Sequence, residues 1–241
     1  MKRLDVLLFE KGLYASREKA KQAIEMGRVC VDDKIVTKPA FLCDGSAKFE
    51  VKPFEFVSRG GFKLQKALED FSCDLKGKIV LDIGASTGGF TDVCLQNGTK
   101  KVYSIDTGEN QLADKIKNDA RVKNFEKTNY LTFSKDNFSD VNFVVIDVSF
   151  VSLTKLIPKL SDDFQKVEIV ALIKPQFECG AEYAKKHKGI VKDEKVQQKI
   201  CENIRHFFEK FGFDVQGIVK SSILGGDGNQ EFLIYTKKII F

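Results

Sequence analysis

Residues 80–92 read Val-Leu-Asp-Ile-Gly-Ala-Ser-Thr-Gly-Gly-Phe-Thr-Asp. The segment begins with a mostly apolar run, which is typical of a buried strand, and residues 90–95 then supply apolar positions that suit a helix packed on a sheet. The glycines between them allow the backbone to approach a ligand closely. We therefore predict a strand, a glycine loop and a helix, the unit that begins many doubly wound α/β sheets.

The residues of this loop limit the kind of ligand that it can bind. The chain has no Gly-x-x-x-x-Gly-Lys-Ser/Thr motif for a triphosphate, and Gly84 to Gly89 only loosely follow the Gly-x-Gly-x-x-Gly pattern of dinucleotide sites. Asp82, at the entrance of the loop, would repel a pyrophosphate but could pair with a cationic ligand. Asp106 ends a second predicted strand about twenty residues further on, where doubly wound folds place the acid that binds a ribose.

The pattern Asp-x-Gly-x-x-x-Gly at residues 82–88 resembles the binding loop of S-adenosylmethionine-dependent methyltransferases. Their cofactor carries an ammonium and a sulfonium group, so the resemblance implies S-adenosylmethionine as the cofactor. For Asn129 we keep two interpretations, a cap on the adenine edge and a loop side chain bonded to its own backbone. The expected cofactor contacts are Asp82, Gly84, Ala85, Ser86, Thr87, Gly88, Phe90, Asp106, Asn129 and Asp147.

Length and composition bound the protein class. The 241 residues, 43% of them hydrophobic, suffice for an ordinary domain with a small companion, and the net charge of +5 permits a polyanionic partner without requiring one. Six scattered cysteines and two histidines indicate neither a zinc site nor a disulfide framework. No window approaches the ~18 apolar residues of a membrane helix. We expect a cytoplasmic protein with no metal and no membrane association.

Residues 1–52 are expected to form a separate small α+β unit. Leu4, Leu7 and Leu8 share one face of a first helix, and Ser16 caps a second helix at 17–26, followed by short strands. Arg-Leu-Asp, then Ser-Arg-x-x-Ala-x-x-x-Ile-x-x-Gly-x-Val-x-Val, then Lys-Pro resembles the alpha-L RNA-binding motif of a small-subunit ribosomal protein and many RNA pseudouridine synthases. The resemblance implies phosphate contacts from Arg3, Ser16, Arg17, Lys21 and Arg28.

A short linker at 53–57 is expected next, because Pro53 cannot continue a strand ladder. Residues 58–241 then alternate strand and helix, which predicts a Rossmann-like parallel sheet. We expect helices in most intervals, including 88–97, 110–118 and 191–212. The expected strands are 79–83, 102–105, 122–125, 141–146, 167–173, 213–219 and 232–236.

Charged residues fall at or near the ends of predicted strands or on adjoining elements. Asp147 and Lys174 each follow a strongly apolar strand, where a charge needs a partner or a function. Glu231 precedes the last strand, and Lys63 lies in the first turns of a helix that opens with a double glycine. Ligands of open α/β sheets bind beyond the carboxyl ends of the strands, so these four side chains are candidate catalytic residues.

Lys63, Asp147, Lys174 and Glu231 match the Lys-Asp-Lys-Glu tetrad of ribose 2'-O-methyltransferases. The whole chain resembles the TlyA family, which joins an alpha-L motif to an FtsJ-like methyltransferase domain. This resemblance implies an rRNA methyltransferase that modifies a cytidine ribose in ribosomal subunits, and the compact ends favour the large subunit; we expect a monomer. Its motifs here are Ser58-Arg59-Gly60-Gly61, the loop at 84–90, Asp147-Val148-Ser149-Phe150 and Lys174-Pro175-Gln176-Phe177-Glu178.

The expected chemistry assigns a role to each member of the tetrad. A ribose 2'-hydroxyl is a weak nucleophile, so the enzyme must take or share its proton while aligning it with the methyl carbon. A lysine can do this when it is partly desolvated and near another cation. We expect Lys174 to be the base, Lys63 to steer the hydroxyl, Asp147 to orient Lys174, and Glu231 to fix Lys63. Arg59, Lys185, Lys186 and Lys188 are expected RNA contacts, although a basic loop at 177–190 could also be solvated surface.

Three other hypotheses remain at this point. The protein could be a membrane-active haemolysin, as the family's historical name suggests, but its best amphipathic segment, 191–212, has an apolar face suited to the sheet. It could also be an RNA-binding protein without catalytic activity, but the presence of all four tetrad residues argues against this. Base methylation typically needs a cysteine nucleophile or an Asn-Pro-Pro-Tyr-like segment, and neither is placed suitably.

Overall fold

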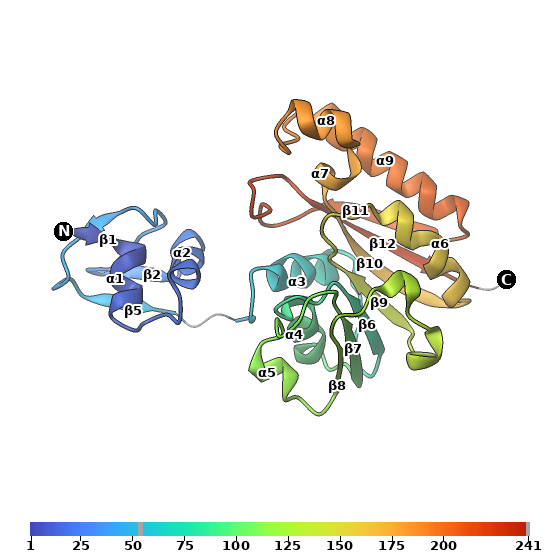
Figure 1. The fold of residues 1–241 in the computed structure, drawn as a ribbon, viewed down its shortest axis with the longest axis horizontal. Coiled ribbons are helices and arrows are strands. Elements are labelled where there is room, and N and C mark those ends of the chain that lie inside the picture. The colour runs from blue at the N-terminus through green and yellow to red at the C-terminus, as the bar shows by residue number, and fades with distance from the viewer. Residues whose placement is uncertain (53–54, 240–241) are drawn as a thin grey trace. The chain divides into compact units, whose positions relative to one another are not determined.

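The computed structural model describes residues 1–52 and 55–239, and the chain divides into two compact units, Met1–Glu55 and Phe56–Phe241 (Figure 1). The division falls inside the segment expected as a linker, whose first two residues, Pro53 and Phe54, lie outside the described residues. Phe56 is only 2% exposed, and its ring packs edge-on against Phe62 with centroids 5.0 Å apart. Phe56 therefore forms part of the core of the second unit.

The first unit packs two helices against short strands. The apolar faces of α1 (Leu4–Glu10) and α2 (Arg17–Glu25) bury Leu4, Leu8 and Ile24. Ser16 caps α2 as expected, since its Oγ accepts the Lys19 amide at 3.2 Å. Strand β2 is the middle strand of an antiparallel sheet ordered β3-β2-β5, and β1 pairs with β4. The strands are β1 (Lys2–Arg3), β2 (Val29–Val31), β3 (Lys34–Ile35), β4 (Leu42–Cys43) and β5 (Phe49–Val51).

The second unit contains a seven-stranded sheet ordered β11-β12-β10-β9-β6-β7-β8 (Figure 1). Strand β12 runs antiparallel to both of its neighbours, and the remaining pairs are parallel. Three strands have the predicted bounds, namely β6, β8 and β10. The strands β7, β9 and β12 differ by one or two residues at one end, and β11 is shifted by one residue at both ends. The strands are β6 (Ile79–Ile83), β7 (Lys101–Ile105), β8 (Val122–Phe125), β9 (Phe143–Ile146), β10 (Val167–Ile173), β11 (Asp214–Lys220) and β12 (Phe232–Lys238).

Helices cover both faces of this sheet. Because successive side chains of a strand point to opposite faces, Val80 of β6 packs in one core with α3 and α4, while Leu81 packs in the other with α6 and α9. The unit is therefore a three-layer sandwich, as the alternating pattern predicts. The helices are α3 (Gly60–Asp70), α4 (Gly89–Gln96), α5 (Asp114–Lys117), α6 (Leu153–Asp163), α7 (Pro175–Glu178), α8 (Ala181–Lys186) and α9 (Glu194–Lys210).

Two segments differ from the sequence-based expectation. The helix predicted at 110–118 begins only at Asp114, because Asn110 takes a left-handed conformation (φ +53°) and Ala113 is extended. The segment predicted as a basic loop contains the helices α7 and α8, which are separated by Gly180 at φ +82°.

The strand order also locates the crevice for a ligand. The chain passes from β6 to β7 and β8 on one side, then returns to β9 and β10 on the other side of β6. At such a switch point the loops after two adjacent parallel strands diverge, and they leave space beyond the carboxyl ends of those strands. Here these are the ends of β6 and β9.

Candidate active site

The glycine loop after β6 adopts a conformation that requires glycine. Gly84 has φ +86°, and a Cβ there would lie 2.6 Å from the carbonyl oxygen of Asp147. Gly88 has φ +93°, and a Cβ there would lie 2.8 Å from Leu112 Cδ1. Side chains at these positions would clash and strain the backbone, so glycine allows the loop to pack tightly against β9 and the segment before α5.

Asp106 braces this loop from the end of β7. Its Oδ2 accepts the Ser86 amide at 2.8 Å, and its Oδ1 accepts the Gly108 amide at 2.7 Å. A carboxylate has about four acceptor positions, so two remain for a ligand. The sequence pointed to Asp106 as a ribose ligand but not to this second role as a support for the loop.

A cavity of about 440 Å³ opens at the carboxyl ends of β6, β7 and β9. The carboxylates of Asp106 and Asp147 line it together with apolar walls that include Ile83, Ile105 and Leu156. Its size lies within the usual range for a ligand site, and acids beside apolar walls suit a cationic nucleoside. Of the expected cofactor contacts, this cavity is lined by Gly84, Ser86, Asp106, Asn129 and Asp147.

The other expected cofactor contacts do not line this cavity. Ala85 and Phe90 are buried in the core with α3 and α4, and neither they nor Thr87 and Gly88 are among the described residues that line the cavity. Asn129 uses its Oδ1 to accept the Leu131 amide at 3.0 Å while it lines the cavity, so its bond to nearby backbone is present in the structure.

Asp82 is completely buried beneath the loop. Its Oδ2 accepts a hydrogen bond of 2.6 Å from the Thr91 hydroxyl, which also lies 3.1 Å from Ser104 Oγ. Its Oδ1 has no hydrogen-bond partner among the described residues. Burial raises the pKa of Asp82 to about 7. The hydrogen bond from Thr91 to this carboxyl group links α4 to β6.

The four candidate catalytic side chains form two ion pairs. Lys63 Nζ lies 2.5 Å from Glu231 Oε2, and both residues are buried. Lys174 Nζ lies 2.6 Å from Asp147 Oδ1 and donates to Ser149 Oγ at 2.9 Å. The structure therefore contains both contacts that the sequence led us to expect.

Close backbone packing brings the start of α3 to the same edge of the sheet. A Cβ at Gly60 would lie 3.6 Å from Asp147 Oδ2, and one at Gly61 would lie 2.6 Å from the ring of Phe56. Lys63 follows in the first turn of α3. The helix that carries one lysine thus begins beside the acid that holds the other, Lys174.

An aromatic pair next to Lys174, an exposed Phe150 and a half-buried Phe177, was not singled out from the sequence. Phe150 is 91% exposed at φ +65°, and its ring centroid lies 5.1 Å from that of Phe177. The Phe177 centroid lies 6.0 Å from Lys174 Nζ. Although both rings occur in quoted motifs, their contact and the exposure of Phe150 could be recognised only in the fold.

The segment after Lys174 is held against α6 by Glu178. This carboxylate accepts hydrogen bonds from Ser152 Oγ at 2.5 Å and from the Leu153 amide at 2.8 Å. Burial raises the pKa of Glu178. The contacts therefore fix the short helix α7 at the start of α6.

The expected RNA contacts of the second unit lie on different elements. Lys185, Lys186 and Lys188 are exposed at the end of α8 and just after it, where the rings of Tyr183 and His187 stack 4.2 Å apart. Arg59 precedes α3, and its Nη2 would lie 3.5 Å from a Cβ at Gly226. Gly226 lies in the loop between β11 and β12, which also contains Asn229 and Glu231. Arg59 therefore lies beside the loop that carries one acid of the tetrad.

In the first unit, three of the five expected RNA contacts lie together, and the other two lie elsewhere. Arg3, Arg17 and Lys21 line one small cleft, whereas Arg28 is largely buried with its Nη2 4.0 Å from Glu55. Ser16 uses its hydroxyl to cap α2.

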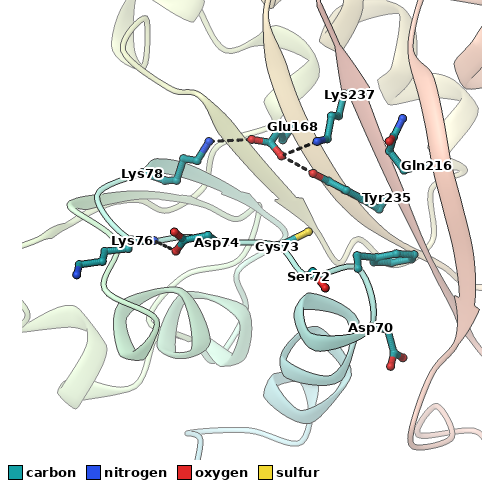
Figure 2. Close-up of a pocket in the computed structure, with 11 residues that line it drawn as sticks. Asp70, Ser72, Cys73, Asp74, Lys76, Lys78, Glu168, Gln216, Tyr235 and Lys237 are labelled. Carbon is teal, nitrogen blue, oxygen red and sulfur yellow. Dashed lines mark hydrogen bonds and ion pairs between the residues drawn. The ribbon is translucent and has the colours of Figure 1, made fainter.

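A second, more polar cavity of about 610 Å³ lies at the opposite end of the sheet (Figure 2). Glu168, near the start of β10, lies 2.7 Å from Lys78 Nζ and 3.7 Å from Lys237 Nζ, and it accepts a hydrogen bond from Tyr235. Burial raises the pKa of Cys73, another lining residue, to about 11. Through Glu168, these contacts join the residue just before β6 to strands β10 and β12.

Two further searches concern only residues 1–52 and 55–239. They contain no group of three or more His, Cys, Asp or Glu side chains arranged to hold a metal ion. None of the helices among them combines the length and the apolar character needed to cross a membrane.

Comparisons with known proteins match both units. Residues 56–238 match the model of FtsJ-like methyltransferases, and residues 2–48 match the S4 domain. The 16S/23S rRNA (cytidine-2'-O)-methyltransferase TlyA of Mycobacterium tuberculosis is 35% identical over 240 residues, which cover 98% of this chain and 89% of the relative. The 23S rRNA (cytidine-2'-O)-methyltransferase TlyA of Campylobacter jejuni is 35% identical over 194 residues, covering 80% and 75%.

A solved structure supports the same grouping. A protein of Streptococcus thermophilus, described provisionally as a hemolysin, superimposes with a TM-score of 0.77 at 40% identity, over 99% of this chain and 88% of its own. The three-layer sandwich of the second unit agrees with the match to FtsJ-like methyltransferases. The chain belongs to the TlyA family of FtsJ-like rRNA methyltransferases that carry an S4 domain.

Proposed function

We propose that this protein transfers a methyl group from S-adenosylmethionine to the ribose 2'-oxygen of a cytidine in large-subunit rRNA. The observation that carries the proposal is the pair of lysine–carboxylate contacts at one edge of the sheet, Lys63 with Glu231 and Lys174 with Asp147. Asp147 also lines the cavity that Gly84 and Ser86 of the glycine loop border. Asp147 would then lie between the bound cofactor and Lys174, which acts on the substrate hydroxyl.

The cavity suits this cofactor chemically. S-adenosylmethionine supplies an electrophilic methyl group on a positively charged sulfur. Asp106 has acceptor positions left for ribose hydroxyls, and Asp147 offers a negative charge to the sulfonium. The apolar residues Ile105 and Leu131 would pack against the adenine.

The lysines would divide the work on the substrate. Lys174, in its neutral form, would accept the proton of the 2'-hydroxyl, and its contacts with Asp147 and Ser149 hold its Nζ in a defined position for this step. Lys63 would orient the hydroxyl oxygen and contribute a second positive charge, which favours release of a proton from a neighbouring lysine. Glu231 would hold Lys63 in place within this buried pair.

The exposed ring of Phe150 and the half-buried ring of Phe177 suit the base of the target nucleotide. Phe150 and Phe177 form an apolar surface beside Lys174, and unpaired bases stack on such side chains in RNA-binding proteins. A nucleotide drawn out of its helix could place its base on this surface and its ribose at Lys174. The choice of cytidine and of large-subunit RNA rests on the names of the two TlyA relatives, both of which include 23S rRNA.

The test is methyl transfer from labelled S-adenosylmethionine to separated ribosomal subunits isolated from cells that lack this gene. We expect label in the large subunit, at a cytidine whose 3' phosphodiester bond resists alkaline hydrolysis because the 2'-oxygen is blocked. Label on a base would contradict ribose methylation, and label in neither subunit would contradict the proposal as a whole. Label in both subunits would overturn only the restriction to the large subunit.

A further inference from the structure

In the S4 unit, one buried carboxylate binds two arginines. Asp5 is only 1% exposed. Its Oδ1 accepts from Arg3 Nε at 2.9 Å, and its Oδ2 accepts from Arg3 Nη2 at 3.1 Å and from Arg17 Nε at 2.9 Å. The Val6 amide donates to Oδ1 as well, at 3.1 Å.

These contacts occupy the acceptor positions of the carboxylate. A carboxylate has about four lone-pair positions, and Asp5 has four recorded donors, so it has little capacity for a further ligand. Burial alone would raise the pKa of Asp5, but the hydrogen bonds from Arg3 and Arg17 lower it. The carboxylate therefore stays ionised near neutral pH and holds both guanidinium groups.

The two arginines keep donors for another partner. Each guanidinium has five N–H donors, and the bonds to Asp5 use two in Arg3 and one in Arg17. Their side chains remain 45% and 55% exposed. Both line a cleft of about 330 Å³ with Lys21, which lies one helical turn after Arg17, and with the exposed Glu18.

We propose that Arg3, Arg17 and Lys21 form a cradle for one phosphodiester group of the RNA, in which Asp5 is a positioning residue that fixes the two guanidinium groups. The proposal rests on the proposed function for the identity of the RNA, and it adds the geometry of one contact. Arginine forks match the oxygens of a phosphate, and prior fixation reduces the side-chain entropy lost on binding.

For the loss of Asp5, the cradle predicts a change in RNA affinity opposite to the change that net charge alone predicts. By charge alone, the removal of any acid beside a phosphate site should tighten RNA binding. If Asp5 positions the arginines, its removal should weaken binding, whereas removal of Glu18 from the same cleft should tighten it. Glu18 is therefore the matched control, since Asp5→Asn and Glu18→Gln change the net charge equally.

The experiment measures binding of the full-length chain to a fluorescein-labelled RNA duplex by anisotropy at several salt concentrations. We expect Asp5→Asn to weaken binding on the order of tenfold and to reduce the slope of log K against log[salt] by about one. We expect Glu18→Gln to bind at least as tightly as the wild type. Equal or tighter binding by Asp5→Asn would overturn the proposal.

A second variant keeps the proposal testable if Asp5→Asn fails to fold, which thermal melting would reveal. The double variant Arg3→Lys, Arg17→Lys preserves charge but lacks the planar forks, and we expect binding to weaken roughly tenfold. Wild-type affinity in this variant would overturn the cradle. The assay contains no methyl donor, so its outcome is separate from that of the methylation experiment.

Discussion

At the scale of single residues, Asp82 combines full burial with a carboxyl oxygen that lacks a partner among the described residues. A buried carboxylate is costly unless it is paired, and burial accordingly raises its pKa from 3.8 to about 7. The proton is therefore retained in the folded protein across a pH range in which the unfolded chain has lost it.

This shift predicts a pH dependence of stability. Between about pH 4 and pH 7 the folded state binds more protons at Asp82 than the unfolded state, so the free energy of unfolding falls as pH rises, by up to roughly 4 kcal/mol. Above pH 7 this contribution is constant. Urea unfolding from pH 4.5 to 7.5 should show that Asp82→Asn gains stability relative to the wild type as pH rises. Parallel curves for the two proteins would contradict the shift.

The sequence was informative about residues whose chemistry depends on strand ends. Asp147 and Lys174 were recognisable because a charge that follows an apolar strand needs a partner or a function, whereas Lys63 and Glu231 joined them through the resemblance to the methyltransferase tetrad. The structure pairs Lys63 with Glu231 and Lys174 with Asp147. The support given by Asp106 to the glycine loop was not predictable, since it depends on the Ser86 amide turning toward the end of β7. It was also not predictable that four donors would occupy the Asp5 carboxylate, because one of them, Arg17, is twelve positions away in the sequence.

At the scale of elements, the tight packing at the start of α3 gives a steric prediction. Alanine at position 61 would place its Cβ 2.6 Å from Phe56, whereas at position 60 the nearest atom would lie 3.5 Å away. We expect Gly61→Ala to lower the free energy of unfolding by about 1–3 kcal/mol. Gly60→Ala, one residue earlier, should lower it much less. Equal effects in thermal or urea unfolding would show that the close contact with Phe56 is not what constrains this helix.

Asn229 joins two loops beside the tetrad. Its Oδ1 accepts the Val191 amide at 2.8 Å, and its Nδ2 donates to the Gly189 carbonyl at 2.8 Å, while Glu231 follows two residues later. We expect Asn229→Ala to speed hydrogen exchange at Val191 and to lower methyl transfer, because two backbone groups lose their partner and the loop that carries Glu231 is released. Faster exchange with unchanged transfer would mean that the loop does not position Glu231.

The regular elements were largely predictable, and the short ones were not. The β6, β8 and β10 strands are dense in β-branched or aromatic residues, so their bounds followed from composition. The four-residue α7 and six-residue α8 were missed because helices this short have little intrinsic stability and depend on contacts such as the stacking of Tyr183 on His187.

At the scale of the whole molecule, the chain combines an S4 unit with an FtsJ-like methyltransferase unit. The hemolysin name attached to a solved relative invites a test of membrane activity. We expect the purified protein to leave dye-filled vesicles intact, because the apolar face of α9, its best amphipathic segment, is buried against the sheet. Dye release at micromolar protein would support membrane activity and require a second function.

The central claim is that Lys174 accepts the proton of a ribose hydroxyl, and its most direct test is the variant Lys174→Arg. Arginine can keep a positive charge beside Asp147, but it does not release a proton near neutral pH. Lys78→Arg, at the ion pair with Glu168 on the opposite edge of the sheet, is the matched control.

The measurement is the single-turnover rate of cytidine 2'-O-methylation, with S-adenosylmethionine binding followed separately by calorimetry. We expect Lys174→Arg to bind the cofactor like the wild type and to transfer the methyl group about 10²–10⁴-fold more slowly, while Lys78→Arg retains the wild-type rate. A wild-type rate in Lys174→Arg would contradict the account.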